Sequence, residues 1–307
     1  MFWRFKLLVL ILNLKNMIPA SFDYKRASSV GEALQILKEI PDAKILAGGH
    51  SLIPAMKLRL SQPELLIDIA KIPELNFIRD RGKYFAIGAA TTHGAIAAHK
   101  SINAKMWWIA NAAEQIGDIQ VRNAGTIGGA IAHADPASDW PAVLMAADAR
   151  VKVEGLYGER VIPANEFFNG FFSTELQEGE IITEIHIPDP TSSETPDSWR
   201  STYQKFVQPA SRFAIVGCAV NLQLSAEGVI EQAYVALNGV SDHAYRATSV
   251  ENALLGRTLS DETAAGACEG ATAEAELIMS DHYADEAYRS HLAQVICKRA
   301  ISACMYG

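Results

Sequence analysis

Two stretches of the chain decide its fold, 46-LAGGHSLIPAMKLRL-60 and 124-AGTIGGAIAHADPASDWPA-142. Each follows apolar or strand-like sequence, contains two adjacent glycines and carries a hydroxyl within two residues of them, Ser51 in the first and Thr126 in the second. Adjacent glycines allow positive φ and let backbone N–H groups come close to a ligand. Because N–H groups gathered in front of a helix bind anions, two such loops could hold the two phosphates of a dinucleotide.

The alternative interpretation is that both glycine pairs are plain tight turns, which is the commoner role of such pairs. Their spacing alone leaves the two interpretations open. The chain has no G-x-G-x-x-G, no G-x-x-x-x-G-K-[ST], no H-E-x-x-H and no G-x-S-x-G motif, and its eight histidines are scattered. We therefore name no catalytic residue and no metal ligand on this chain.

Composition indicates an ordinary globular protein of about two domains. The 307 residues are 49% apolar and 20% charged, with a formal net charge of −8. An acidic body binds polyanions poorly, so nucleic acid is excluded as a main partner. The four cysteines form no C-x-x-C pair, so we expect reduced thiols in a cytoplasmic protein, with no iron–sulfur or zinc site.

The first sixteen residues, MFWRFKLLVLILNLKN, differ from the rest in being basic and apolar. Their apolar run, Leu7 to Leu12, is too short to span a bilayer, so we expect no stable membrane insertion. The segment is either the start of a secretory signal or an upstream start, and the lack of a convincing cleavage site favours the second. We expect residues 1–16 to be an extension outside the fold, with Met17 as the true beginning.

Periodicity and turn residues predict alternating helices and strands before residue 188. A helix over 30–39 is followed by strands over 44–47 and 65–69, which is typical of a βαβ unit. Trp107 and Trp108 fall in a predicted helix over 104–116, and we expect Trp108 to lie nearer the surface. The remaining predicted elements are strands over 84–88, 149–154 and 181–187, a helix from Thr91 or Thr92 to Ala98, and a helix that ends near Ala147.

Residues 188–198, PDPTSSETPDS, form the clearest linker, because they combine three prolines with acids and hydroxyls and hold no large apolar residue. Beyond them, strands come first and helices afterwards, which indicates a separate α+β domain. The predicted strands cover 202–207, 214–224 and 229–237, and the predicted helices cover about 246–256, 260–277 and 284–304.

As whole strings, the two glycine loops resemble those of the FAD-binding medium subunit of molybdenum hydroxylases. This family includes the medium subunit of aerobic carbon monoxide dehydrogenase and the FAD-binding subunit of xanthine dehydrogenase. The resemblance extends over about 17–307. It also rests on IPASFDYKRASSVGEALQIL near the start, LLIDIAKIPEL and AIGAATTH between the loops, and YQKFVQPASRFAIVGCAV after the linker.

The resemblance implies an α+β fold in which a two-subdomain FAD-binding module of the vanillyl-alcohol-oxidase-like (PCMH) type precedes a C-terminal domain of a three-stranded sheet plus helices. The implied FAD-binding domain covers 17–190, with subdomains of about 17–71 and 72–190. A linker over 191–198 and a C-terminal domain over 199–307 follow. FAD would lie between the first two subdomains, with its isoalloxazine near the third.

Cofactor-binding residues carried over from the family lie in both loops and at three further positions. Asp139 matches an aspartate that binds the cofactor, Ile182 an aliphatic residue that packs near the flavin, and Lys205 a lysine near the ring. Without the resemblance, Asp139 could equally be a solvated charge on the surface. Lys205 could be a lysine whose stem lies in an apolar strand while its ammonium group reaches water. Ser211-Arg212 departs from the family's frequent Gly-Asp. The loop residues are Ala47, Gly48, Gly49, His50 and Ser51, and Thr126, Ile127, Gly128, Gly129 and Ala130.

The implied role is electron transfer within a heteromeric oxidoreductase. A large subunit would hold the molybdenum cofactor and a small subunit two [2Fe–2S] clusters, in a dimer of heterotrimers. FAD on this chain would take electrons from the clusters and release them to an external acceptor. Two alternatives stay open, a stand-alone flavin-dependent oxidoreductase acting on a small organic substrate and a scaffold subunit that has lost its flavin.

Overall fold

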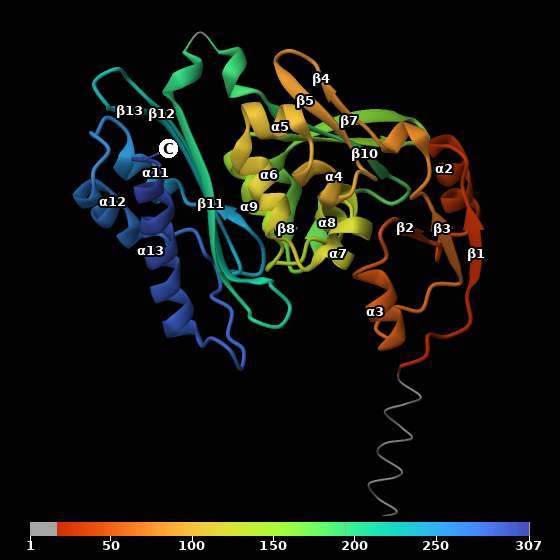
Figure 1. Ribbon diagram of the computed structural model, residues 1–307. Coiled ribbons are helices and arrows are strands. Elements are labelled where there is room, and N and C mark those ends of the chain that lie inside the picture. The colour runs from red at the N-terminus through yellow and green to blue at the C-terminus, as the bar shows by residue number, and fades with distance from the viewer. Residues whose placement is uncertain (1–16, 194, 307) are drawn as a thin grey trace, which may run out of the picture.

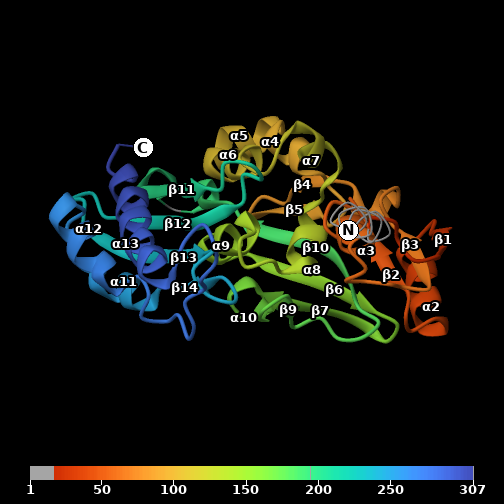
Figure 2. The ribbon, with the colours of Figure 1, turned by 90° about the horizontal axis from the view of Figure 1, so that it is seen from below.

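The computed structural model describes residues 17–306 except residue 194 (Figure 1). The extension expected over 1–16 lies outside the described residues. Three larger sheets with their helices follow one another along the molecule, and Figure 2 shows them in a row from β1 at one end to α12 at the other.

The first sheet is parallel and has the order β1-β3-β2. It consists of β1 (Asp23–Arg26), β2 (Lys44–Leu46) and β3 (Leu65–Asp68). Helix α2 (Val30–Glu39) begins where the side chain of Ser29 accepts a hydrogen bond from the Glu32 N–H, and its apolar face packs on the sheet. The predicted βαβ unit is therefore present, and α3 (Leu52–Lys57) follows β2 directly after the first glycine loop.

The second sheet is antiparallel with the order β4-β5-β10-β6-β7, so β10 returns from much later in the chain to pair between β5 and β6. Its helices include α8 (Ile127–His133), which follows the second glycine loop, and α9 (Asp139–Ala146), which is buried along its whole length. The strands are β4 (Ile78–Asp80), β5 (Tyr84–Gly88), β6 (Arg150–Gly155), β7 (Gly158–Pro163) and β10 (Ile181–Pro188).

The single helix expected over 104–116 is wrong, because the chain folds there as α5 (Lys100–Lys105) and α6 (Trp107–Glu114). Met106 separates them with φ −141° and ψ 57°, outside the helical region. This break reverses the expected order of the tryptophans, since Trp108 is 6% exposed and Trp107 is 60% exposed. Other elements of this region are α4 (His93–Ala97), α7 (Ile119–Ala124), α10 (Ala164–Phe167), and the short pair β8 (Phe168–Gly170) and β9 (Ser173–Thr174).

The third sheet has four strands in the order β11-β12-β13-β14, so the expected three-stranded sheet is corrected. The fourth strand, β14 (Tyr245–Arg246), pairs with the end of β13 and is too short for a sequence pattern to reveal. The helix expected over 260–277 is also shorter, because α12 ends at Ala267 and a 3₁₀ turn follows. The elements are β11 (Trp199–Val207), β12 (Ala214–Leu224), β13 (Ile230–Asn238), α11 (Thr248–Leu254), α12 (Asp261–Ala267) and α13 (Glu286–Ala303).

The third sheet is covered on both faces, which explains the long apolar run of β12. Cys218 and Val220 face the core shared with α11 and α13, whereas Ala219 joins the core of the second region. The expected linker contains the end of β10 and two short 3₁₀ turns, Pro190–Ser192 and Pro196–Ser198. None of the helices in the described part of residues 17–306 is long and apolar enough to cross a bilayer.

Candidate functional site

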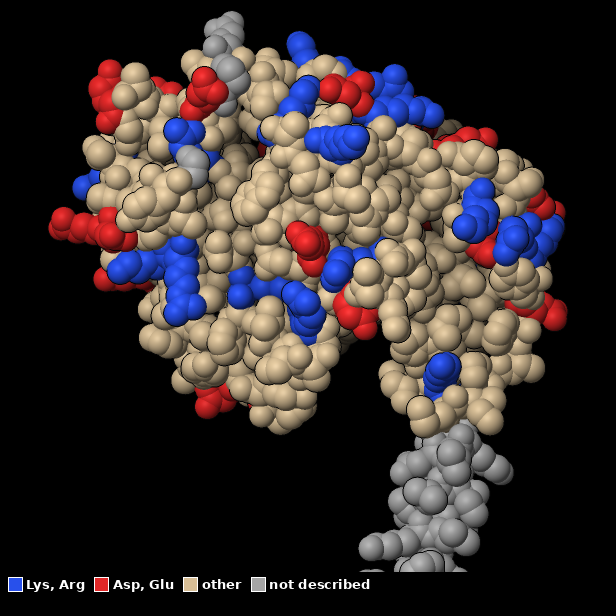
Figure 3. All heavy atoms as spheres, in the orientation of Figure 1, with Lys and Arg blue, Asp and Glu red and all other residues tan. Residues whose placement is uncertain are grey.

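A cavity of about 700 Å³ lies where the three sheet regions meet, a size typical of a small-molecule or cofactor site. The first region contributes the loop before α3, the second contributes α8 and the start of β10, and the third contributes residues 211–213. Figure 3 shows the surface hollowed beside the part of the molecule that carries α3. The cavity therefore brings together segments that are up to about 165 residues apart, and both glycine loops lie on its wall.

The first glycine loop presents free backbone donors to this cavity. The N–H groups of the five consecutive residues Gly48 to Leu52 have no hydrogen-bond acceptor among the described residues, and all five residues line the cavity. Gly49 has φ +70°, a conformation that favours glycine. Ser51 precedes α3 and makes no side-chain cap. This loop therefore supplies what an anion needs, a run of unpaired N–H groups in a concave wall.

In the second glycine loop, the backbone N–H groups are already hydrogen-bonded to other protein groups. The sequence had suggested that both loops offer free N–H groups to a ligand. The N–H of Ile127 donates to the Thr91 carbonyl at 3.1 Å and that of Gly128 to the Ala89 carbonyl at 2.9 Å. The N–H of Gly129 donates to the Thr126 hydroxyl oxygen at 3.0 Å, which caps α8. This loop shapes the cavity, and the hydroxyl proton of Thr126 remains its donor.

Close packing explains one glycine of each loop, Gly48 in the first and Gly128 in the second. A Cβ on Gly128 would lie 2.5 Å from the Ala89 Cβ, and a Cβ on Gly48 would lie 2.7 Å from the Gly125 Cα. Both distances are far inside van der Waals contact, so only glycine allows these backbones to approach. Gly48 thereby holds the first loop against the second.

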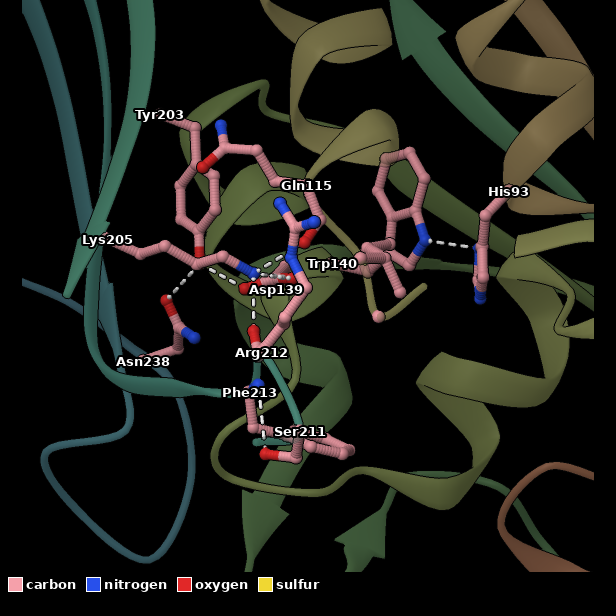
Figure 4. A network of polar contacts seen from close by, with 12 residues as sticks. His93, Gln115, Asp139, Trp140, Tyr203, Lys205, Ser211, Arg212, Phe213 and Asn238 are labelled. Carbon is pink, nitrogen blue, oxygen red and sulfur yellow. Dashed lines mark hydrogen bonds and ion pairs between the residues drawn. The ribbon is translucent and has the colours of Figure 1, made fainter. Parts of the chain in front are cut away.

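Asp139, on the cavity wall, forms a buried ion pair with Lys205 behind it (Figure 4). The Lys205 Nζ lies 2.8 Å from the Asp139 carboxylate, and it also donates to the backbone carbonyls of Gln115 at 3.0 Å and Arg212 at 2.9 Å. The Tyr203 hydroxyl donates to the other Asp139 oxygen at 2.5 Å. Burial raises the pKa of Asp139, and the ammonium of Lys205 and the hydroxyl of Tyr203 oppose that effect.

Of the three further residues carried over from the family, two line the cavity and the third does not. Asp139 and Ile182 line the cavity. Lys205 does not line it, and its side chain is only 1% exposed, so the alternative of a snorkelling lysine is wrong. Lys205 instead joins β11 to α9 and fixes the loop that carries Arg212. Arg212 itself lines the cavity with φ +63°, and its guanidinium has no ion-pair partner among the described residues.

His93 is a cavity residue that the sequence reasoning did not single out. It opens α4 after the Thr92 cap and is 4% exposed. Its Nδ1 accepts a hydrogen bond from the Trp140 indole N–H at 3.0 Å. Burial lowers the pKa of His93 from 6.5 to about 4, with smaller contributions from His50 and Arg122, so the ring is neutral at pH 7. The only sequence signal is the string TTHG, which by itself predicts a helix start.

Two family models match the chain, one on each side of residues 191–200. Residues 20–190 match the family model described as "FAD binding domain in molybdopterin dehydrogenase", and residues 201–304 match "CO dehydrogenase flavoprotein C-terminal domain". The carbon monoxide dehydrogenase medium chain of Hydrogenophaga pseudoflava is 40% identical over 94% of this chain and 98% of its own length. The glyceraldehyde dehydrogenase medium chain of Sulfolobus acidocaldarius is 36% identical over 92% and 98%.

Solved structures give the same result. Carbon monoxide dehydrogenase from Hydrogenophaga pseudoflava superimposes with a TM-score of 0.89 over 94% of this chain and 99% of that chain, at 40% identity. Quinoline 2-oxidoreductase from Pseudomonas putida 86 superimposes with a TM-score of 0.87 over 94% and 99%, at 29% identity.

Proposed function

Because the chain belongs to the family of FAD-binding medium subunits of molybdenum hydroxylases, we propose that its cavity holds one non-covalent FAD for electron transfer. The observation that carries the site is the run of five free N–H groups from Gly48 to Leu52, which matches the negative charge of a pyrophosphate. The cavity volume of about 700 Å³ is in the range of cofactor sites. The residues present therefore fit the group.

The proposed contacts follow from the lining. Gly48, Gly49, His50 and Ser51 would bind the phosphates, with Ala47 beside them. Thr126 would add its hydroxyl, while Gly128, Gly129 and Ala130 shape the adjoining wall. Ile127 does not line the cavity and packs in the hydrophobic core behind that wall. Asp139 and Ile182 would border the isoalloxazine from the wall of the second region, and Lys205 would act there through Asp139.

When bound, FAD would supply the electron chemistry, because a flavin exchanges electrons either one or two at a time. The chain's own residues bind and orient it. No nucleophile or acid–base pair is assigned, so hydroxylation itself would occur on another subunit. We propose that a large subunit with the molybdenum cofactor and a small subunit with [2Fe–2S] clusters complete the complex, as a dimer of heterotrimers in the cytoplasm.

The proposed domain organisation assigns 17–190 to FAD binding, with subdomains of about 17–71 and 72–190, and 191–198 to a linker. Residues 199–307 form the C-terminal domain. Each proposed unit has its own sheet, which supports this division. The loop at 211–213 lets the third unit close one side of the cavity.

Co-expression tests the proposed function. The chain is co-expressed and purified with its proposed large and small subunits, and metal analysis is followed by substrate-dependent dye reduction. We expect a complex with molybdenum, iron and FAD that reduces the dye, and a lone chain that binds FAD but oxidises no organic substrate. A lone chain that turns over an organic substrate at about one per second or faster would instead support the stand-alone oxidoreductase.

A further inference from the structure

His93 carries a polar group that nothing in the described chain satisfies. The ring lines the cavity, is 4% exposed, and forms a hydrogen bond only through Nδ1. Its Nε2 has no partner among the described residues. Because the ring lines the cavity and Nδ1 is occupied by Trp140, Nε2 is the ring atom that remains free to bind a ligand there.

Trp140 determines which nitrogen carries the proton. An indole N–H can only donate, so Nδ1 of His93 must accept. In the neutral ring the proton then resides on Nε2. Figure 4 shows Trp140 on one edge of the imidazole, with the other nitrogen turned away from it. The structure thus fixes His93 as a donor on its cavity side.

That donor lies beside the free N–H groups of the first glycine loop. A Cβ on Gly125 would lie 3.0 Å from Nε2 of His93, and a Cβ on Gly48 would lie 2.7 Å from the Gly125 Cα. His93 also donates its backbone N–H to the Gly125 carbonyl at 3.0 Å. Gly125 therefore connects the imidazole to the start of the N–H run, and both sets of donors border the same stretch of cavity.

We propose that His93 binds the pyrophosphate of the dinucleotide through Nε2–H, and that Trp140 is a positioning residue that keeps the imidazole in the donating tautomer. The inference rests on the proposed function, since it takes FAD as the ligand. It adds a side-chain donor from α4 to the backbone donors of the first loop. The interaction needs no positive charge on the ring.

The test measures binding of FAD and of ADP to flavin-free protein by fluorescence titration. His93→Leu removes the donor, and we expect FAD binding to weaken roughly 10- to 100-fold, the range for a hydrogen bond to a charged group. His93→Gln offers an amide N–H near the Nε2 position and should weaken binding no more than about threefold. Trp140→Phe should give an intermediate loss, because Nδ1 is no longer held as the acceptor. ADP, which keeps the pyrophosphate, should show the same order of variants.

His186→Gln is the matched control, since this histidine pairs with Glu184 at 3.0 Å and lies outside the cavity lining. The affinity of the His186→Gln variant for FAD should equal that of the unchanged protein. Circular dichroism identifies variants that fail to fold, and in that case His93→Gln and Trp140→Phe decide the result. Tight FAD binding by folded His93→Leu, or a loss for FAD without a loss for ADP, would overturn the inference. Failure of the unchanged protein to bind FAD would overturn the proposed function itself.

Discussion

The backbone of Gly48 lies directly against the backbone of Ala124, so the two glycine loops touch without side chains between them. A Cβ on Gly48 would lie 2.8 Å from the carbonyl carbon of Ala124. This contact joins the first sheet region to the second at the point where the free N–H groups begin. Because Gly48 has no Cβ, the two loops can lie this close together, and their separation sets the width of the cavity.

Gly48→Ala should force the loops apart. We expect a loss of about 1–3 kcal/mol in the free energy of unfolding, the usual range for overpacking, together with a clear loss of bound flavin. Urea unfolding and the flavin-to-protein ratio measure the two effects. Gly266→Ala is the control, because a Cβ there meets nothing within 4 Å inside helix α12 and should stabilise by about 0.5–1 kcal/mol. Full flavin occupancy in Gly48→Ala would contradict the proposed contact.

Lys205→Met should be strongly destabilising, because it leaves the buried carboxylate of Asp139 without its cation. Breaking a buried ion pair from one side costs about 3–5 kcal/mol. The combination with Asp139→Asn should recover part of that loss. Lys25→Met removes an exposed ion pair with Glu32 at 3.4 Å, and its effect should stay below about 1 kcal/mol. Equal unfolding free energies for Lys205→Met and Lys25→Met would show that the buried pair has no such role.

Protonation of His93 should make the protein less stable in mild acid. Its pKa is about 4 in the folded protein against 6.5 as the ordinary value, so the unfolded chain binds more protons between these limits. Stability should therefore fall as pH decreases from 6.5 towards 4, by about 2 kcal/mol between pH 7.5 and pH 5. His50 and Arg122 face the ring and also lower the pKa of His93. His93→Gln has no such titration, and a pH profile identical to that of the unchanged protein would contradict the assignment.

Arg212→Gln should make bound flavin harder to reduce, because Arg212 lines the cavity at the end closed by the third sheet region and has no ion-pair partner in the described part of the chain. A tenfold change in a two-electron equilibrium corresponds to about 30 mV, and we expect a decrease of at least that size. Lys44→Gln makes the same charge change at the other end of the cavity and should leave the midpoint potential nearly unchanged. A larger shift for Lys44→Gln would reverse the proposed orientation of the cofactor.

Sequence patterns correctly predicted the elements whose start and apolar face are both determined by neighbouring residues. Ser28 or Ser29 as a cap, with the apolar spacing that follows, predicts a helix over 30–39, and α2 has these bounds with Ser29 as its cap. The break at Met106 is different, because no glycine or proline marks it and tertiary packing buries that side chain. The two-residue strand β14 likewise exists only through its pairing with β13.

The candidate site was predictable as a pair of loops but not as a hydrogen-bonding pattern. The acceptors that occupy the N–H groups of Ile127 and Gly128 are carbonyls of Thr91 and Ala89, more than 30 residues earlier in the chain. Nor does any local pattern reveal that Lys205 pairs with Asp139, 66 residues away. Motif resemblance identified two segments that line the cavity. The difference between them, free N–H groups in the first loop and paired N–H groups in the second, depends on contacts that only the folded chain defines.

Flavin analysis of the purified chain tests the central claim most directly. The protein is denatured, the chain is removed, and the supernatant is analysed for flavin by chromatography. The account predicts about one FAD per chain, released free because the proposed contacts are hydrogen bonds and packing with no covalent link. Colour that remains with the denatured chain, or the absence of FAD from protein supplied with an excess of it, would contradict the account.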